Sequence, residues 1–142
     1  MIDLVDFPPM KSAAMAGQAG EFLTTYLLVR AGLQAIPVDV YGPDIWCRFP
    51  NGAVRTIEVK TAQSVSYRLR GGRRPSYAYH VPRREADIYA FVALDKERVL
   101  FKLPEDIPTY TTIRLSPEEF SIRNIQDSLS LLIPDYNVRS AA

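Results

Sequence analysis

The tetrapeptide Pro50-Asn51-Gly52-Ala53 constrains the fold of this chain most strongly, because it predicts a tight turn between two strands. Asn-Gly between hydrophobic runs is the strongest short signal for a β-hairpin. We expect the two strands to span residues 44–49 and 54–62. With the turn centred near residue 51 or 52, positions 44 and 58 lie nearly opposite each other, within the ~4.5–8 Å that separates cross-strand neighbours.

A helix is predicted over residues 13–31, with Ser12 as its N-cap and Gly32 as its end. Apolar residues recur at a spacing of three to four and predict a buried stripe of Met15, Ala19, Phe22, Tyr26, Val29 and Leu33. At ~100° per residue, Glu21 lies roughly 120° from the centre of that stripe. We therefore expect Glu21 on a flank of the helix, facing a cleft beside a sheet.

The remaining pattern predicts an α/β (α+β) fold with a mixed central β-sheet flanked by helices. Residues 35–40 read as a short strand, and Pro37 places it at an edge. The run IYAFVAL at 88–94 predicts a strand buried on both faces, and further strands are expected at 99–103 and 111–115. A helix is expected to begin near Ser116-Pro117-Glu118-Glu119 and to continue toward residue 132. The 142 residues predict one domain, with a core of about 12–103 and a C-terminal extension over 104–142.

Composition excludes several classes of protein. The single cysteine, Cys47, allows no internal disulfide, and we expect it to be a small core residue in a reducing, cytoplasmic setting. One His and one Cys do not make a conventional zinc site. No apolar stretch reaches the ~18 residues of a membrane span, so we expect no membrane partner. The net charge of +1 says little about partners.

Acidic residues are predicted to meet at the open end of the hairpin. Glu58 and Lys60 project from one face of their strand, because residues i and i+2 share a face. Asp44 lies opposite them, and Glu21 comes from the helix. Neighbouring carboxylates repel each other unless one is protonated or a cation lies between them. Mg²⁺ prefers such oxygen ligands and would polarise a phosphodiester, with Lys60 steadying the attacking water or a phosphate oxygen.

Each of these residues has a structural explanation when it is taken alone. Glu58 with Lys60 fits a solvated ion pair on a sheet, Glu21 fits an exposed helix acid, and Asp44 fits a turn residue after Gly-Pro. The combination of spacing, order and element type favours a site for phosphodiester hydrolysis.

The motifs Pro43-Asp44 and Glu58-Val59-Lys60, preceded by Gly20-Glu21-Phe22, resemble the PD-(D/E)XK nuclease superfamily, in its Holliday-junction-resolvase-like and homing-endonuclease-like branches. The resemblance covers about residues 17–103. It implies a restriction-endonuclease-like core and a Mg²⁺-dependent endonuclease that cleaves DNA and leaves 5′-phosphate and 3′-hydroxyl ends. Mn²⁺ is expected to substitute for Mg²⁺. The chain departs from the family in one respect, since no helix is evident after the strand that carries Glu58.

The resemblance also implies roles for individual residues. Asp44 and Glu58 would bind the metal, joined by Glu21 and by the carbonyl of Val59. Lys60 would assist the attacking water. Gln63, three residues further on, is a candidate for lining the site.

Residues 60–84 are strongly basic and contain no acid before Glu85. Arginine suits phosphate contacts, and tyrosine packs on sugars or stacks on unpaired bases. We therefore expect this segment to bind nucleic acid through Arg68, Arg70, Arg73, Arg74, Tyr77, Tyr79, His80, Arg83 and Arg84. A solvated basic loop, or a site for another acidic partner, is the alternative.

Two other functions remain open from the sequence. One is a nuclease-fold module that binds nucleic acid or protein without cutting, and the other is an RNA-directed nuclease of the same fold. For the DNA endonuclease, the substrate is duplex or branched DNA. Because duplex cutting takes two active sites or two successive nicks, we expect a homodimer or higher homo-oligomer. The apolar residues near the C-terminus fit either an interface or the core: Leu129, Leu131, Leu132 and Ile133.

Overall fold

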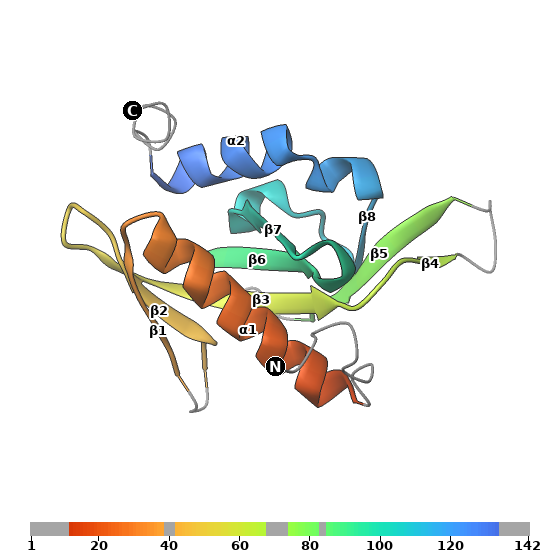
Figure 1. Cartoon of the computed structure of the whole chain (residues 1–142), viewed down its shortest axis with the longest axis horizontal. Coiled ribbons are helices and arrows are strands. Elements are labelled where there is room, and N and C mark those ends of the chain that lie inside the picture. Colours follow the sequence, from red (N-terminus) through yellow and green to blue (C-terminus); the bar gives the residue numbers. More distant parts are fainter. Residues whose placement is uncertain (1–11, 39–41, 68–73, 83–84, 134–142) are drawn as a thin grey trace, which may run out of the picture.

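Both α-helices cover one face of a five-stranded sheet, and a three-stranded sheet covers part of the other face (Figure 1). The computed structural model describes residues 12–38, 42–67, 74–82 and 85–133. The larger sheet has the order β1-β2-β3-β6-β7, and the smaller sheet has the order β4-β5-β8. The helices are α1 (Ala13–Arg30) and α2 (Ile122–Leu132), and the strands are β1 (Gln34–Pro37), β2 (Ile45–Arg48), β3 (Val54–Ala62), β4 (Ser66–Tyr67), β5 (Pro75–His80), β6 (Ile88–Ala93), β7 (Arg98–Lys102) and β8 (Thr112–Leu115). Short 3-10 helices span Leu94–Lys96, Pro104–Asp106 and Pro117–Phe120.

The predicted hairpin is confirmed as β2 and β3. Gly52 adopts a φ of +85°, which glycine tolerates without steric cost, and the Asn51 side chain accepts a hydrogen bond from the Ala53 amide. The register pairs Ile45 with Ile57. The turn therefore brings residue 44 beside residue 58, as the sequence predicts.

The larger sheet is mixed, which confirms the predicted fold class. β3 and β6 run parallel, whereas the other neighbouring strands in this sheet are antiparallel. Every residue of β6 is buried, because helices cover one of its faces and the smaller sheet covers the other. Ile88 and Val92 pack toward the helices, whereas Tyr89 and Phe91 pack toward β5 and β8.

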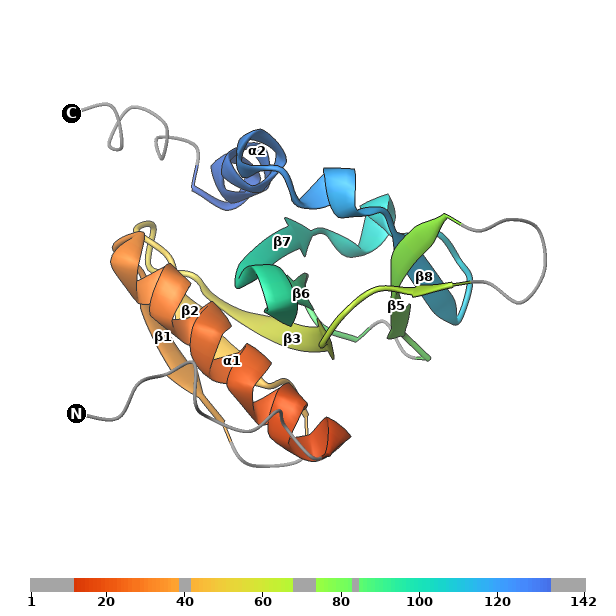
Figure 2. The same cartoon turned by 45° about the vertical axis from the view of Figure 1, so that its right-hand side comes forward.

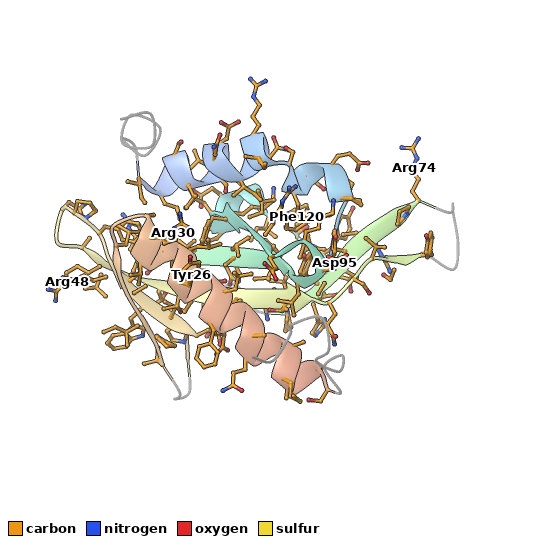
Figure 3. All side chains as sticks on the ribbon, viewed as in Figure 1. Tyr26, Arg30, Arg48, Arg74, Asp95 and Phe120 are labelled. Carbon is orange, nitrogen blue, oxygen red and sulfur yellow. The ribbon has the colours of Figure 1, made fainter. Side chains whose placement is uncertain are left out.

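The predicted buried stripe of α1 is wrong. The helix contacts the sheet through Ala16, Gly20, Thr24 and Leu28, and Met15, Phe22, Tyr26 and Val29 are each more than half exposed. The helix has apolar residues on all sides, so spacing did not identify the packed side. Small residues at a spacing of four let the helix approach closely: a Cβ added at Gly20 would overlap the hydroxyl of Thr61 on β3. On the outer side, Arg30 lies over the ring of Tyr26 at 5.8 Å (Figure 3).

No α-helix occurs between β3 and β6 in the described parts of that segment, in agreement with the departure seen in the sequence. The described parts of the basic segment form β4 and β5, and β5 also pairs with β8. Figure 2 shows these three strands at the far end of the molecule from β1 and β2. The ends of β3 and β6 are tied together: Asp87, directly before β6, accepts hydrogen bonds from the amide and hydroxyl of Thr56.

The described residues after 103 contribute to the same core as the residues before them. Phe120 is fully buried among the residues between the two sheets, and Leu129 and Ile133 pack with both helices and the larger sheet. Leu131 is 62% exposed, and Leu132 is partly buried. Core packing thus accounts for most of the C-terminal apolar residues, and a homo-oligomer interface there stays a prediction. Within the described residues, no helix is both long and apolar enough to cross a membrane.

Candidate active site

Asp44 is fixed at the point where β2 separates from β3. Its amide donates to the Ile57 carbonyl at 3.1 Å, and its own carbonyl accepts from the Val38 amide at 2.9 Å. Its carboxylate accepts a 2.7 Å hydrogen bond from the Val59 amide, in the position that a strand carbonyl would otherwise take. One oxygen is thereby held against β3, and a carboxylate has a second oxygen for another partner. The Val59 amide thus holds Asp44 beside the stretch of β3 that carries Glu58 and Lys60.

Glu58 and Lys60 form an ion pair on β3. The Lys60 Nζ lies 3.4 Å from the Glu58 Oε1, and the two side chains are 20% and 29% exposed, respectively. They project from the face that α1 does not cover, because Ile57 and Thr61, in the alternate positions, face the helix. The predicted grouping of Asp44 with Glu58 and Lys60 is therefore confirmed as a placement, and their roles stay predictions.

Glu21 is not brought into a three-acid group with Asp44 and Glu58. Within the described parts of the chain, no three Asp, Glu, His or Cys side chains lie close enough to hold a metal ion. The reason is the side on which α1 packs. Gly20 meets Thr61 on one face of β3, whereas Glu58 projects from the other. The structure thus does not bring the three predicted acids together, and metal binding by Asp44, Glu58, Glu21 and the Val59 carbonyl stays a prediction.

The other candidate residues near the site differ in exposure. Gln63 is exposed just after β3, and its carbonyl accepts from the Asp95 amide at 3.1 Å. Its place in the site stays a prediction. Cys47 is fully buried, and burial raises the pKa of its thiol to about 11. The thiol is therefore uncharged at neutral pH and acts as a small core residue, as expected.

Tyr77 and Tyr79 are core residues and not nucleic-acid contacts, which corrects the prediction. The Tyr77 hydroxyl donates to Asp95 at 2.8 Å, and burial together with Asp95 raises its pKa to about 12. The Tyr79 hydroxyl donates to the Val92 carbonyl at 2.9 Å. Tyr77, Tyr79 and Val81 occupy every second position, and this spacing indicates one buried face of a strand. The nearby arginines led to the prediction of a basic surface instead.

The exposed part of the predicted nucleic-acid segment is smaller than expected. Arg74 and His80 are exposed at the two ends of β5, and Arg74 extends into solvent (Figure 3). The predicted contacts at Arg68, Arg70, Arg73, Arg83 and Arg84 lie outside the described residues. Binding by these arginines stays a prediction.

The contrast between buried tyrosine and exposed arginine gives a direct test. Tyr79→Phe removes a buried hydrogen bond and is expected to lower the free energy of unfolding by about 1 kcal/mol without changing DNA affinity. Arg74→Ala is expected to leave stability unchanged and to lower DNA affinity while reducing its salt dependence. Urea unfolding and fluorescence anisotropy measure the two quantities. A loss of DNA affinity in Tyr79→Phe at unchanged stability would contradict the assignment.

A bacterial homing endonuclease of solved structure, I-Ssp6803I, has a similar fold, with a TM-score of 0.64 and 13% sequence identity. The match covers 93% of this chain and 99% of that one, so it extends past residue 103. No protein-family model matches the sequence, and no curated protein matches it. At this identity the likeness establishes a shared fold, namely a mixed sheet with flanking helices.

Proposed function

We propose that this chain is a Mg²⁺-dependent DNA endonuclease of the PD-(D/E)XK type. The observation that carries the proposal is the 2.7 Å bond from the Val59 amide to the Asp44 carboxylate, which holds Asp44 beside Glu58 and Lys60. The similarity in fold to a homing endonuclease supports it. The proposed reaction adds water to phosphorus and breaks the bond to O3′. The phosphate then stays on the 5′ end, and O3′ gains a proton to become a hydroxyl.

The donors at this site fit a hard divalent cation. Asp44 and Glu58 offer carboxylate oxygens, the Val59 carbonyl is a third candidate, and Mg²⁺ commonly takes one or two carboxylates together with waters. Glu58 already attracts a cation, since Lys60 lies 3.4 Å from it. When bound, Mg²⁺ would neutralise charge on the phosphate and increase the acidity of water, and Mn²⁺ would serve similarly.

The residues around the donors have separate tasks in this proposal. The Val59 amide fixes the Asp44 carboxylate before substrate arrives, so the pair needs little rearrangement. Lys60 turns from Glu58 toward the phosphate and holds a nonbridging oxygen or the attacking water. Glu21 does not bind the ion directly and acts on the site through a water molecule from the side of α1. Gln63 lines the approach to the site.

The proposed function is tested by incubating supercoiled, linear and four-way-junction DNA with Mg²⁺, with Mn²⁺ or with a chelator. Cleavage that requires the ion is expected. Because Glu21 is not grouped with the other acids, Glu21→Gln is expected to slow cleavage about ten- to a hundred-fold. This is the usual loss for a residue that contacts the ligands of a metal and not the metal itself. Cleavage at the wild-type rate after Glu58→Gln would overturn the assigned site.

A module that binds without cutting is the second candidate, favoured by the lack of a three-acid group in the described residues. Calorimetry separates the two functions. The endonuclease predicts a heat of Mg²⁺ binding that Asp44→Asn removes, whereas the binding module predicts salt-sensitive DNA binding with no such heat.

A further inference from the structure

Part of the larger sheet is uncovered and carries exposed apolar residues. On the face away from α1, one row across the strands consists of Ile36, Trp46 and Thr56, and the next consists of Gln34, Arg48 and Val54. Trp46 is 50% exposed and Ile36 is 64% exposed. The smaller sheet packs on this face over β6, β7 and the end of β3, and among the described residues no element lies over β1 and β2 on this side (Figure 1).

The uncovered face is continuous with the candidate active site. Glu58 is two residues from Thr56 on β3, so it shares the face with Trp46 and is its diagonal cross-strand neighbour, at ~7–8 Å between Cα atoms. Lys60 follows on the same side of β3. A nucleotide next to a phosphodiester bound at Glu58 is therefore within reach of Trp46.

We propose that this face of β1, β2 and β3 is a duplex-DNA contact surface, which rests on the proposed endonuclease function. Trp46 and Ile36 pack against the deoxyriboses that line the groove beside the scissile phosphate. The guanidinium of Arg48 binds a phosphate further along the same DNA strand. Indole and guanidinium groups suit these contacts, and B-DNA's major groove admits β-strands.

Geometry and charge favour DNA over a second copy of the chain. A protein partner seated on Trp46 would also cover Glu58 and Lys60 and block access to the site. Among the described residues on this face of β1, β2 and β3, the cations are Arg48 and Lys60, and the acid is Glu58, a proposed metal ligand. Asp87 lies at the border of the face, where Thr56 binds its carboxylate.

Trp46 is the only tryptophan in the chain, so its fluorescence reports on this surface directly. We expect a saturating amount of short mixed-sequence duplex, at low salt and with a chelator present, to reduce acrylamide quenching of Trp46 several-fold. Unchanged quenching at saturation overturns the proposal. Protection that rises with protein concentration without DNA also overturns it, because a second copy then covers the face.

Two arginine variants form a matched pair for affinity. Arg48 and Arg55 are both exposed in the same hairpin, but Arg55 pairs with Cys47 and lies on the opposite face. Arg48→Ala is expected to weaken duplex binding about ten-fold and to lower the slope of log affinity against log salt by about 1. Arg55→Ala is expected to change neither. Equal effects from the two variants overturn the proposal.

The outcomes separate this surface from the proposed function. If cleavage depends on the ion but DNA does not protect Trp46 from quenching, the proposed DNA contact surface is wrong and the proposed endonuclease function stands. Wild-type protein that neither binds nor cuts duplex or four-way-junction DNA overturns both. Circular dichroism confirms that Arg48→Ala and Arg55→Ala are folded.

Discussion

Replacing Asp44 with asparagine is expected to reduce cleavage by at least about a thousand-fold, because it removes one of the two carboxylates that would hold the ion. The asparagine side-chain oxygen is able to accept the hydrogen bond that the Val59 amide donates to Asp44. Local structure and stability are therefore expected to stay close to wild type. Plasmid nicking rates with saturating Mg²⁺ measure the first effect, and urea unfolding measures the second.

Asp87→Asn is the matched control. Asp87 also accepts a hydrogen bond from a β3 amide, that of Thr56, but it lies directly before β6 and binds β3 three residues before Val59. Both variants remove one negative charge beside β3. Cleavage is expected to survive in Asp87→Asn and to be lost in Asp44→Asn. If both variants cut DNA like the wild type, Asp44 has no part in catalysis.

Gly20→Ala is expected to destabilise the protein by about 1–2 kcal/mol, although alanine is the better helix former. A Cβ at this position would overlap the Thr61 hydroxyl, which is buried and has no hydrogen-bond partner in the described residues. Overpacking a close contact costs ~1–3 kcal/mol, which exceeds the ~1 kcal/mol that helix propensity gains. Thermal and urea unfolding measure the change.

Gly17→Ala should change stability in the opposite direction. Gly17 lies in the same helix, and a Cβ there would have no atom within 4 Å. Its substitution is expected to stabilise the protein by up to about 1 kcal/mol through helix propensity alone. Adding Thr61→Ala to Gly20→Ala should recover much of the loss. Stabilisation by Gly20→Ala alone would contradict the close packing of α1 on β3.

Local signals in the sequence were sufficient for the hairpin and for the buried strand. Asn51 and Gly52 determine their turn through a side-chain hydrogen bond and a positive φ, both of which are properties of adjacent residues. This turn fixes the strand register that brings Asp44 beside Glu58. The apolar run of β6 has no polar side, so burial on both faces followed directly.

The packed side of α1 and the role of the tyrosines depend on distant contacts. Phe22 is more apolar than Gly20, yet Gly20 packs against β3, because close approach favours the smaller residue. Tyr77 is buried because Phe120, distant in sequence, packs against its ring at 5.1 Å. Neither partner can be inferred from the local pattern, so the buried side of α1 and the two tyrosines were predicted incorrectly.

The connection from β3 to β6 is anchored at both ends. Where the chain enters β6, the Thr56 amide donates a hydrogen bond to the Asp87 carboxylate. Past the ends of β3 and β6, the Asp95 amide donates a hydrogen bond to the Gln63 carbonyl. Changes in the length of the connection between β4 and β5 therefore need not disturb Glu58 or Lys60, which lie on β3 between these two hydrogen-bonded points. Doubling a loop costs only about 0.6 kcal/mol in closure entropy. A longer connection between β4 and β5 is thus compatible with an unchanged β3.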